Sequence, residues 1–176
     1  MQKAFETKGY RCIVPSLTPN NASLGLELLS EQLKDFIDIE TKGTNGPICL
    51  VGFSMGGLVA RYYLQELGGY QIVSLFFSIA APHQGSLMAY LSANKGAKQM
   101  RPGSQFLQSL EQSPALLNEL PCYSYWTPFD LMILPANSSL WDKAENIKIN
   151  ALCHPLMARD GRIIDDIIAR VKLNSK

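Results

Sequence analysis

Residues 48–60 constrain the fold of this chain more than any other segment. An apolar run typical of a β-strand, residues 48–51, leads into the pentapeptide Gly-Phe-Ser-Met-Gly at 52–56, and residues 58–64 then suit an α-helix. A serine on a sharp turn between a strand and a helix is the arrangement of a nucleophile elbow. The pentapeptide also occurs by chance in glycine-bearing loops, but the flanking strand and helix favour an elbow with Ser54 as the nucleophile.

We expect both glycines of the pentapeptide to have a steric role. Because glycine has no Cβ, Gly52 and Gly56 would let the strand and the helix pass close together while Ser54 adopts an unfavourable backbone conformation. The helix that begins behind Ser54 would direct unpaired N–H groups, and the positive end of its dipole, toward an oxyanion formed there.

The composition predicts one globular domain with a sizeable core, since 47% of the 176 residues are hydrophobic. The 16 basic and 15 acidic residues leave a formal charge of +1, which does not favour a nucleic acid partner or a charged membrane surface. No stretch approaches the ~20 apolar residues of a membrane span. We therefore expect no membrane-spanning segment, and at most transient contact with a lipid surface.

Cysteine and histidine usage does not favour a metal site. The 4 cysteines are widely spaced, and we expect free thiols rather than a disulfide framework or a zinc site. A metal site would also need histidines, and the chain has only His83 and His154. We therefore expect no metal and no cofactor.

Strand-like and helix-like segments alternate along the chain. The hydrophobic pattern predicts helices over residues 22–39, 55–67 and 161–171, and a helix end over 1–8. It predicts strands over 10–14, 48–53, 72–80, 122–126 and 146–152. Such alternation indicates an α/β protein with a mainly parallel sheet.

One long insertion interrupts this alternation. Residues 83–121 combine Gly, Ser, Asn, Lys and Pro with short apolar clusters at 87–91, 106–110 and 115–120. An insertion of this length is typical of a lid, although ordinary surface helices on the sheet would give the same pattern. It follows a predicted strand, and so lies at the edge where α/β sheets bind ligands.

A serine hydroxyl becomes nucleophilic when a base accepts its proton and an acid orients that base. His154 follows the predicted strand 146–152, in a loop from which a base can reach the sheet edge, and His83 follows the strand 72–80. The chain order that accompanies a nucleophile elbow is serine, acid, histidine. This order selects His154 as the base and leaves His83 as a structural or pocket-lining residue.

The acid must precede this histidine in the chain. Asp130 follows a predicted strand after a short turn, and the apolar residues 131–135 beside it would bury its carboxylate, which then needs a partner. Asp142 and Glu145 are the competitors, but they lie in a polar stretch and resemble solvated loop charges. We therefore expect Asp130 to orient His154.

Four segments carry a family resemblance: the elbow and helix at 52–61, Ala-Pro-His-Gln-Gly-Ser at 81–86, Gln-Met-Arg-Pro-Gly-Ser-Gln-Phe-Leu at 99–107, and Asp-Leu-Met-Ile-Leu-Pro at 130–135 with Ser138. In this combination the chain resembles the bacterial lipase and carboxylesterase group of the α/β-hydrolase fold. The resemblance implies a three-layer fold, with helices on both faces of a mainly parallel sheet and a helical lid at 83–121.

The same resemblance implies a serine ester hydrolase that acts on lipid or other apolar acyl esters through an acyl-enzyme. Its catalytic residues would be Ser54, Asp130 and His154. Its oxyanion and substrate site would comprise Met55, through its N–H, together with His83, Leu87 and Phe106. The same residues would also serve acyl transfer, with an alcohol or thiol in place of water.

Two departures from the family pattern follow. Phe53 stands where the family carries a histidine before the nucleophile, which implies altered packing. The strand and His-Gly loop that bring the second oxyanion donor are absent, so we expect an N-terminally incomplete domain. That strand would lie between residues 10–14 and 48–53, and its absence would leave a gap or make those strands pair. Losing one donor costs about 2.7–4 kcal/mol, so a catalytically impaired fragment or a binding module is a further alternative.

Overall fold

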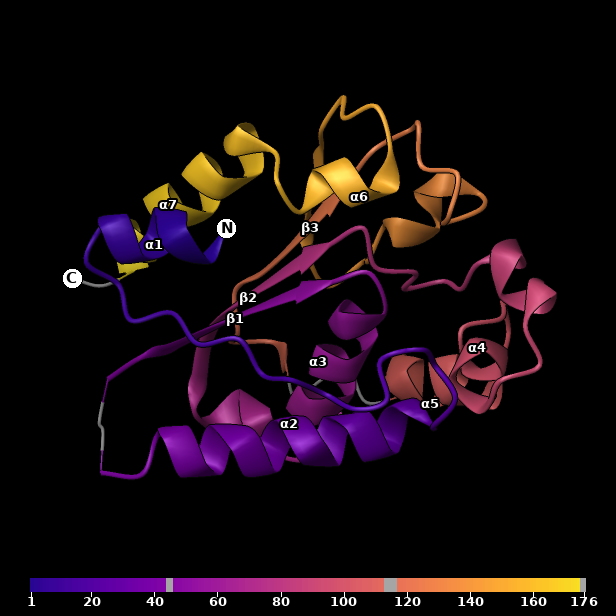
Figure 1. Cartoon of the computed structure of the whole chain (residues 1–176), viewed down its shortest axis with the longest axis horizontal. Helices are drawn as coiled ribbons and strands as arrows, with labels where there is room; N and C mark the ends of the chain where they lie inside the picture. Colours follow the sequence, from indigo (N-terminus) through magenta and orange to yellow (C-terminus); the bar gives the residue numbers. More distant parts are fainter. Residues whose placement is uncertain (44–45, 113–116, 175–176) are drawn as a thin grey trace.

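Four parallel β-strands form the centre of the molecule. The computed structural model describes residues 1–43, 46–112 and 117–174 (Figure 1). Within these residues the strands lie in the order β1 (Ile48–Phe53), β2 (Val73–Ile79), β3 (Cys122–Trp126) and β4 (Glu145–Lys148). Because neighbouring strands are parallel, all their carboxyl ends meet at one edge of the sheet.

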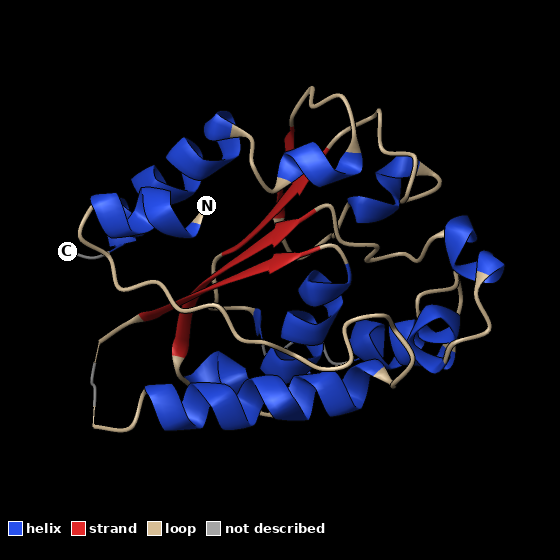
Figure 2. Cartoon of the chain, in the orientation of Figure 1, coloured by secondary structure: helices blue, strands red, loops and turns tan. Residues whose placement is uncertain are grey.

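Helices cover both faces of this sheet (Figure 2). One face carries α2 (Leu26–Glu40), α3 (Met55–Glu66) and α5 (Gln105–Gln112), and the other carries α1 (Gln2–Thr7) and α7 (Gly161–Asn174). The side chains of β2 enter both cores, Phe76 on the α3 side and Phe77 on the α7 side, and both are fully buried. Burial on both faces explains the continuous apolar run, and the predicted three-layer α/β architecture is confirmed.

The prediction of a strand at residues 10–14 is wrong. These residues pair with no strand of the described chain. Arg11 instead reaches the end of α2, where its Nη2 lies 2.7 Å from Glu40 Oε2. Tyr10 and Cys12 pack against the core on the α7 side. Tyr10 and Cys12 are therefore held by packing on the core rather than by pairing in the sheet, while Ile13 and Val14 are exposed.

Two element boundaries also differ from the prediction. Residues 22–25 precede α2 because Ala22 has a positive φ of 60° and Gly25 is extended. β4 ends at Lys148, so residues 149–152 lie outside the strand that was predicted over 146–152. Beyond β4 the chain contacts the loop after β3, since Thr127 Oγ1 donates to the Ala151 carbonyl at 2.7 Å.

The insertion 83–121 is partly helical and begins beyond the carboxyl end of β2 (Figure 1). Its members are the 3₁₀ helix η2 (Leu87–Leu91), α4 (Lys95–Gln99) and α5. α5 belongs to the core, in which it buries Phe106, Leu107 and Leu110. η2 exposes Leu87, Tyr90 and Leu91. Ala115 and Leu116 of the third apolar cluster lie outside the described residues. Among the helices that the structure describes, none has the length and apolar character to cross a membrane.

Phe76→Ala should lower the free energy of unfolding by about 3–5 kcal/mol, because the lost side chain leaves a cavity in a close-packed core. Ile39→Ala is the control, since Ile39 is 72% exposed, and it should change stability by less than about 0.5 kcal/mol. Urea unfolding followed by circular dichroism measures both. Equal effects of the two substitutions would contradict the described core.

Candidate active site

Ser54 lies between the carboxyl end of β1 and the first turn of α3. Its backbone has φ 53° and ψ −128°, a region that residues with a Cβ rarely occupy. The turn is held by two hydrogen bonds: Ser54 N–H donates to the Ile79 carbonyl at 2.8 Å, and Gly57 N–H donates to the Ser54 carbonyl at 2.9 Å. The strand, strained turn and helix predicted from the pentapeptide are therefore present.

The two glycines of the pentapeptide do not share the predicted steric role. A Cβ on Gly52 would lie 2.6 Å from Gly57 Cα and 2.7 Å from the Gly56 carbonyl oxygen, so Gly52 is needed for the close approach of strand and helix. A Cβ on Gly56 would meet no atom within 4 Å, and the prediction for Gly56 is wrong. The second crowded position is Gly57, where a Cβ would collide with the Ala81 side chain.

Asp130 and His154 meet beyond the ends of β3 and β4. Asp130 Oδ2 lies 2.7 Å from His154 Nδ1, and both side chains are buried. The other carboxylate oxygen, Oδ1, accepts hydrogen bonds from the N–H groups of Met132 and Ile133, each at 2.9 Å. His154 begins α6 (His154–Met157). The acid loop and a short helix therefore hold the pair in one geometry.

The hydrogen bonds keep Asp130 ionised. Burial alone would raise the pKa of Asp130, but the bonds from His154 and from the Ile133 and Met132 N–H groups outweigh burial and lower the pKa below its ordinary value. An ionised carboxylate has no proton to donate, so His154 Nδ1 carries the proton of this contact. The lone pair of the neutral imidazole then lies on Nε2.

His154 Nε2 is buried and has no hydrogen-bond partner among the described residues. The His154 ring packs against Phe53, with 4.9 Å between the ring centroids. Because Phe53 immediately precedes Ser54, the His154 ring lies next to the elbow. Among the described residues, Ser54 and His154 are not joined by a hydrogen bond. A buried acceptor without a partner is uncommon in folded proteins and marks a site for a further group.

Met55 begins α3 and borders a cavity beside the elbow. The cavity has a volume of about 270 Å³, and its lining comes from α2, α3 and the segment before α2, with the residues Pro15, Ser16, Leu17, Asn20, Leu29, Met55, Gly56 and Val59. The first N–H groups of a helix have no acceptor within the helix. The N–H of Met55 is therefore available to an oxygen bound near Ser54.

Of the other predicted site residues, His83 and Phe106 have partners other than the Asp130–His154 pair, whereas the Leu87 N–H donates to the Leu134 carbonyl of the acid loop at 2.8 Å. His83 is buried, with its Nε2 2.8 Å from Ser78 Oγ and its ring stacked on Trp141 at 4.8 Å. Phe106 is buried on α5 and stacks on Tyr62 at 5.5 Å. Leu87 is exposed on η2. The contacts of His83 were not predicted from the sequence. Ser78 was the available signal, because it interrupts an apolar strand and a buried hydroxyl requires a partner.

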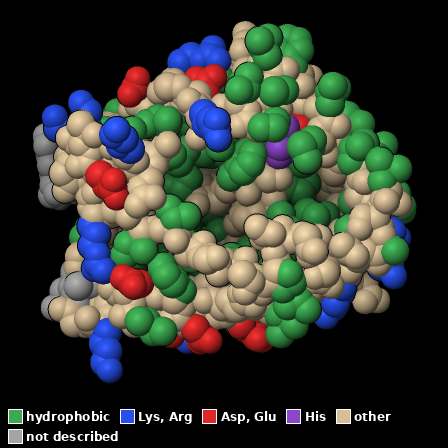
Figure 3. Space-filling model, in the orientation of Figure 1, with side chains coloured by type: hydrophobic (Ala, Val, Ile, Leu, Met, Phe, Trp, Pro, Cys, Tyr) green, Lys and Arg blue, Asp and Glu red, His purple; other side chains and the backbone are tan. Residues whose placement is uncertain are grey.

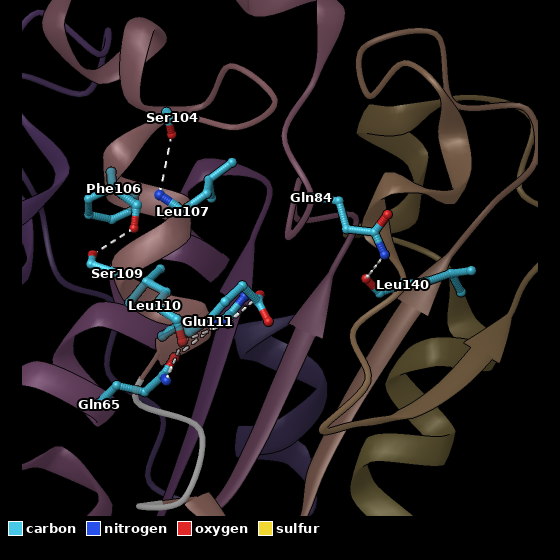
Figure 4. A network of polar contacts seen from close by, with 10 residues as sticks. Gln65, Gln84, Ser104, Phe106, Leu107, Ser109, Leu110, Glu111 and Leu140 are labelled. Atoms are coloured by element: carbon cyan, nitrogen blue, oxygen red, sulfur yellow. Dashed lines mark hydrogen bonds and ion pairs between the residues drawn. The ribbon is translucent and has the colours of Figure 1, made fainter.

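A polar network joins α5 to α3 (Figure 4). Arg61 lies 4.7 Å from the centroid of Trp141 and 2.7 Å from Glu111. Gln65 Nε2 donates to the Leu110 carbonyl at 2.8 Å. Burial lowers the pKa of His83 well below its ordinary value, and the charge of Arg61 lowers it further, so His83 is neutral at pH 7.

Exposed apolar side chains lie on segments that contact the acid loop, and Figure 3 shows hydrophobic residues gathered along the rim of a hollow beside a histidine. They come from η2 and from the loops that hold Asp130 and His154, and comprise Leu87, Met88, Tyr90, Leu91, Phe129, Leu131, Met132, Leu152 and Leu156. Ser86 Oγ joins two of these segments, since it donates to the Met132 carbonyl at 2.9 Å and accepts from the Leu134 N–H at 3.0 Å.

Comparison with known proteins agrees with this architecture. The sequence model of the family described as lecithin:cholesterol acyltransferase matches residues 26–151. The Bacillus licheniformis lipase BlEst2 in mature form has a TM-score of 0.70 at 14% identity, over 100% of this chain and 84% of that one. MGS-MChE2, an α/β-hydrolase enzyme from a metagenome of lagoon sediments of Mar Chica, Morocco, has a TM-score of 0.63 at 16% identity, over 98% and 82%.

Aspergillus fumigatus lipase B has a TM-score of 0.64 at 17% identity, over 74% of this chain and 35% of that one. At these identities the likeness shows the α/β-hydrolase fold, which confirms the fold expected from the sequence. No curated protein sequence matches the chain significantly.

Gly52→Ala should lower the free energy of unfolding by about 1–3 kcal/mol or more, because the new methyl group would collide with the backbone of α3. Gly56→Ala is the matched control. Its methyl group meets open space, so it should leave stability unchanged or raise it by up to about 1 kcal/mol. Thermal and urea unfolding of both variants test the difference, and a larger loss for Gly56→Ala would contradict the described turn.

The stability of the protein should depend on the protonation of His83. Below about pH 6.5 the unfolded chain binds a proton at His83 that the folded protein excludes. The free energy of unfolding therefore decreases as the pH is lowered, by at most about 1.4 kcal/mol per pH unit. In His83→Gln this contribution is lost, and its free energy of unfolding should fall less between about pH 7 and about pH 5.5. Urea titrations at both pH values measure it, and identical pH slopes for variant and wild type would refute it.

Proposed function

Because the chain belongs to the lecithin:cholesterol acyltransferase family, we propose that it is a lipolytic serine hydrolase that cleaves apolar acyl esters through an acyl-enzyme. The observation that carries the proposal is the buried Asp130–His154 pair, whose free Nε2 lies beside the elbow that presents Ser54. The proposed catalytic residues are Ser54, Asp130 and His154.

In the acylation step, Ser54 Oγ attacks the ester carbonyl carbon while its proton passes to His154 Nε2. Asp130 stabilises the imidazolium that forms and keeps the ring in the orientation required for the transfer. The tetrahedral intermediate then collapses, its carbon–oxygen bond breaks, and the leaving alcohol takes the proton from Nε2. The product remaining on the enzyme is an ester between the acyl group and Ser54.

In the deacylation step, His154 Nε2 removes a proton from water, and the resulting hydroxide attacks the acyl carbon. The second tetrahedral intermediate releases the carboxylic acid, and the proton returns from Nε2 to Ser54 Oγ. The oxyanion of each intermediate would lie at the start of α3, where the Met55 N–H and the positive end of the helix dipole stabilise negative charge.

The surroundings of the site support an apolar substrate. The exposed apolar rim borders both the acid loop and the loop before His154, so a hydrophobic acyl chain would approach over side chains that do not retain water strongly. Within the insertion 83–121 we assign the role of a lid to η2, because its apolar side chains are exposed. α5 is packed into the core and would stay in place.

Acyl transfer is the alternative chemistry, and the description of the matching family as an acyltransferase favours it. It uses the same acyl-enzyme, with the hydroxyl or thiol of an acceptor replacing water in deacylation. Product analysis with p-nitrophenyl butyrate and increasing glycerol separates the two: hydrolysis yields butyrate throughout, whereas transfer yields glyceryl butyrate in rising proportion.

Labelling with a fluorophosphonate tests the proposed nucleophile. The wild-type protein should be labelled at Ser54, Ser54→Ala should not be labelled, and Asp130→Asn should lower kcat for p-nitrophenyl butyrate by about 10⁴-fold. Asp142→Asn is the matched control because Asp142 is exposed, and it should leave kcat unchanged. A folded wild-type protein that neither labels nor turns over the ester would contradict the proposed hydrolase and favour a binding module.

A further inference from the structure

A second cavity, of about 440 Å³, lies between α5 and the loop after β2. Gln108 and Glu111 line it from α5, and His83 and Gln84 line it from the loop (Figure 4). Among the described residues that line it, none is a proposed catalytic residue and none borders the smaller cavity beside the elbow. Sites for small molecules have volumes of about 300–1,000 Å³, so the cavity is large enough to hold one.

Three buried side chains beside this cavity have polar atoms without partners. The Arg61 guanidinium carbon lies 4.7 Å from the centroid of the Trp141 ring, and His83 stacks on the same indole at 4.8 Å. Among the described residues, Arg61 Nη1, His83 Nδ1 and Trp141 Nε1 have no hydrogen-bond partner. Arg61 and His83 are 1% exposed, and Trp141 is 3% exposed. Buried polar atoms are nearly always paired, so the cluster marks a place for a further group.

All three of these atoms are donors. The guanidinium and the indole can only donate hydrogen bonds. Ser78 Oγ lies 2.8 Å from His83 Nε2, and Ser78 is fully buried. Its hydroxyl proton needs an acceptor, which this nitrogen provides, so the neutral imidazole carries its own proton on Nδ1. Three donors and one positive charge suit an anionic acceptor.

Glu111 indicates which anion the guanidinium accepts. Its Oε1 lies 2.7 Å from Arg61 Nη2, although the Glu111 side chain is 59% exposed and that of Arg61 only 1%. An exposed carboxylate gains little from such a contact, because water competes for it and the long side chain loses conformational freedom. A carboxylate that enters the cavity can therefore bind Arg61 at Nη1, beside Glu111 or in its place.

We propose that this cavity binds a small hydroxylated carboxylate, whose carboxylate group pairs with Arg61 and whose hydroxyl groups bind the amides of Gln84 and Gln108. Amide side chains both donate and accept hydrogen bonds, as hydroxyl groups do. A fatty acid suits the cavity less well, because Leu107 is the one large aliphatic side chain among the described residues that line it. The proposal goes beyond the proposed hydrolase and holds whether or not the chain cleaves esters.

Glucuronate is the probe, and glucose, which has the same ring without the carboxylate, is its matched control. The chain has 2 tryptophans, so Trp126→Phe leaves Trp141 as the reporter of binding. Glucuronate should change the emission of Trp141 saturably, and glucose should bind about tenfold more weakly or worse because it cannot pair with Arg61. Equal binding of the two, or a Kd for glucuronate above about 1 mM, would overturn the proposal.

Hexanoate separates a hydroxylated ligand from a fatty acid, because it carries the carboxylate without the hydroxyl groups. It should bind about tenfold more weakly than glucuronate, since the amides of Gln84 and Gln108 would be left without partners from the ligand. Hexanoate that binds as tightly as glucuronate, or more tightly, would contradict the assigned ligand class and favour a product fatty acid.

Two substitutions at the cavity should have opposite effects on glucuronate binding. Glu111→Gln removes a competitor for Arg61 and a like charge, so it should tighten binding by about threefold to tenfold. Arg61→Lys keeps the charge but loses the planar fork, so it should weaken binding about tenfold. Glu6→Gln is the matched control, because Glu6 is exposed on α1 at the other face of the sheet.

Weaker binding by Glu111→Gln, unchanged binding by a folded Arg61→Lys protein, or an equal change in Glu6→Gln would each overturn the proposal. Arg61 is buried, so its substitution can prevent folding. Glu111 is exposed, so Glu111→Gln decides the question in that case, and binding to it is measured without any ester substrate.

Discussion

The hydrogen bond from the Ser54 N–H to the Ile79 carbonyl holds the end of β1 against the end of β2, and the rest of the site depends on it. It fixes the unfavourable conformation of Ser54, and this conformation sets the direction in which α3 leaves the sheet. Gly52 and Gly57 permit the close approach that this direction requires. With α3 in place, Ser54 lies at the end of β1 directly after Phe53, whose ring packs against His154.

The Asp130–His154 pair depends on a different part of the chain. Its two residues come from loops that follow neighbouring strands, and the acid loop is held by backbone hydrogen bonds to Asp130 itself. The carboxylate thus organises the loop that carries it and also orients the imidazole. Substitution of Asp130 would therefore alter the conformation of this loop as well as the orientation of His154.

Much of this could be predicted from the sequence, because strong local signals coincide with the fold at the elbow, at β2 and at the acid loop. Asp130 could be identified because an acidic residue beside an apolar stretch needs a buried partner. The predictions that proved wrong were based on the local sequence alone. Residues 10–14 have the composition of a strand, but pairing depends on a neighbour that the local sequence does not reveal. Gly56 and Gly57 are adjacent, and only the packing of Ala81 distinguishes the crowded one.

The hydroxyl of Ser86 joins the proposed lid to the acid loop, because it bonds both to Met132 and to Leu134 while its own residue precedes η2. Leu87 N–H adds a third connection, to the Leu134 carbonyl at 2.8 Å. A displacement of η2 that included these residues would break the contacts that brace the turn after Asp130. Opening of the proposed lid would therefore compete with the bracing of the turn that carries Asp130, the residue proposed to orient the base, because both depend on the same few hydrogen bonds.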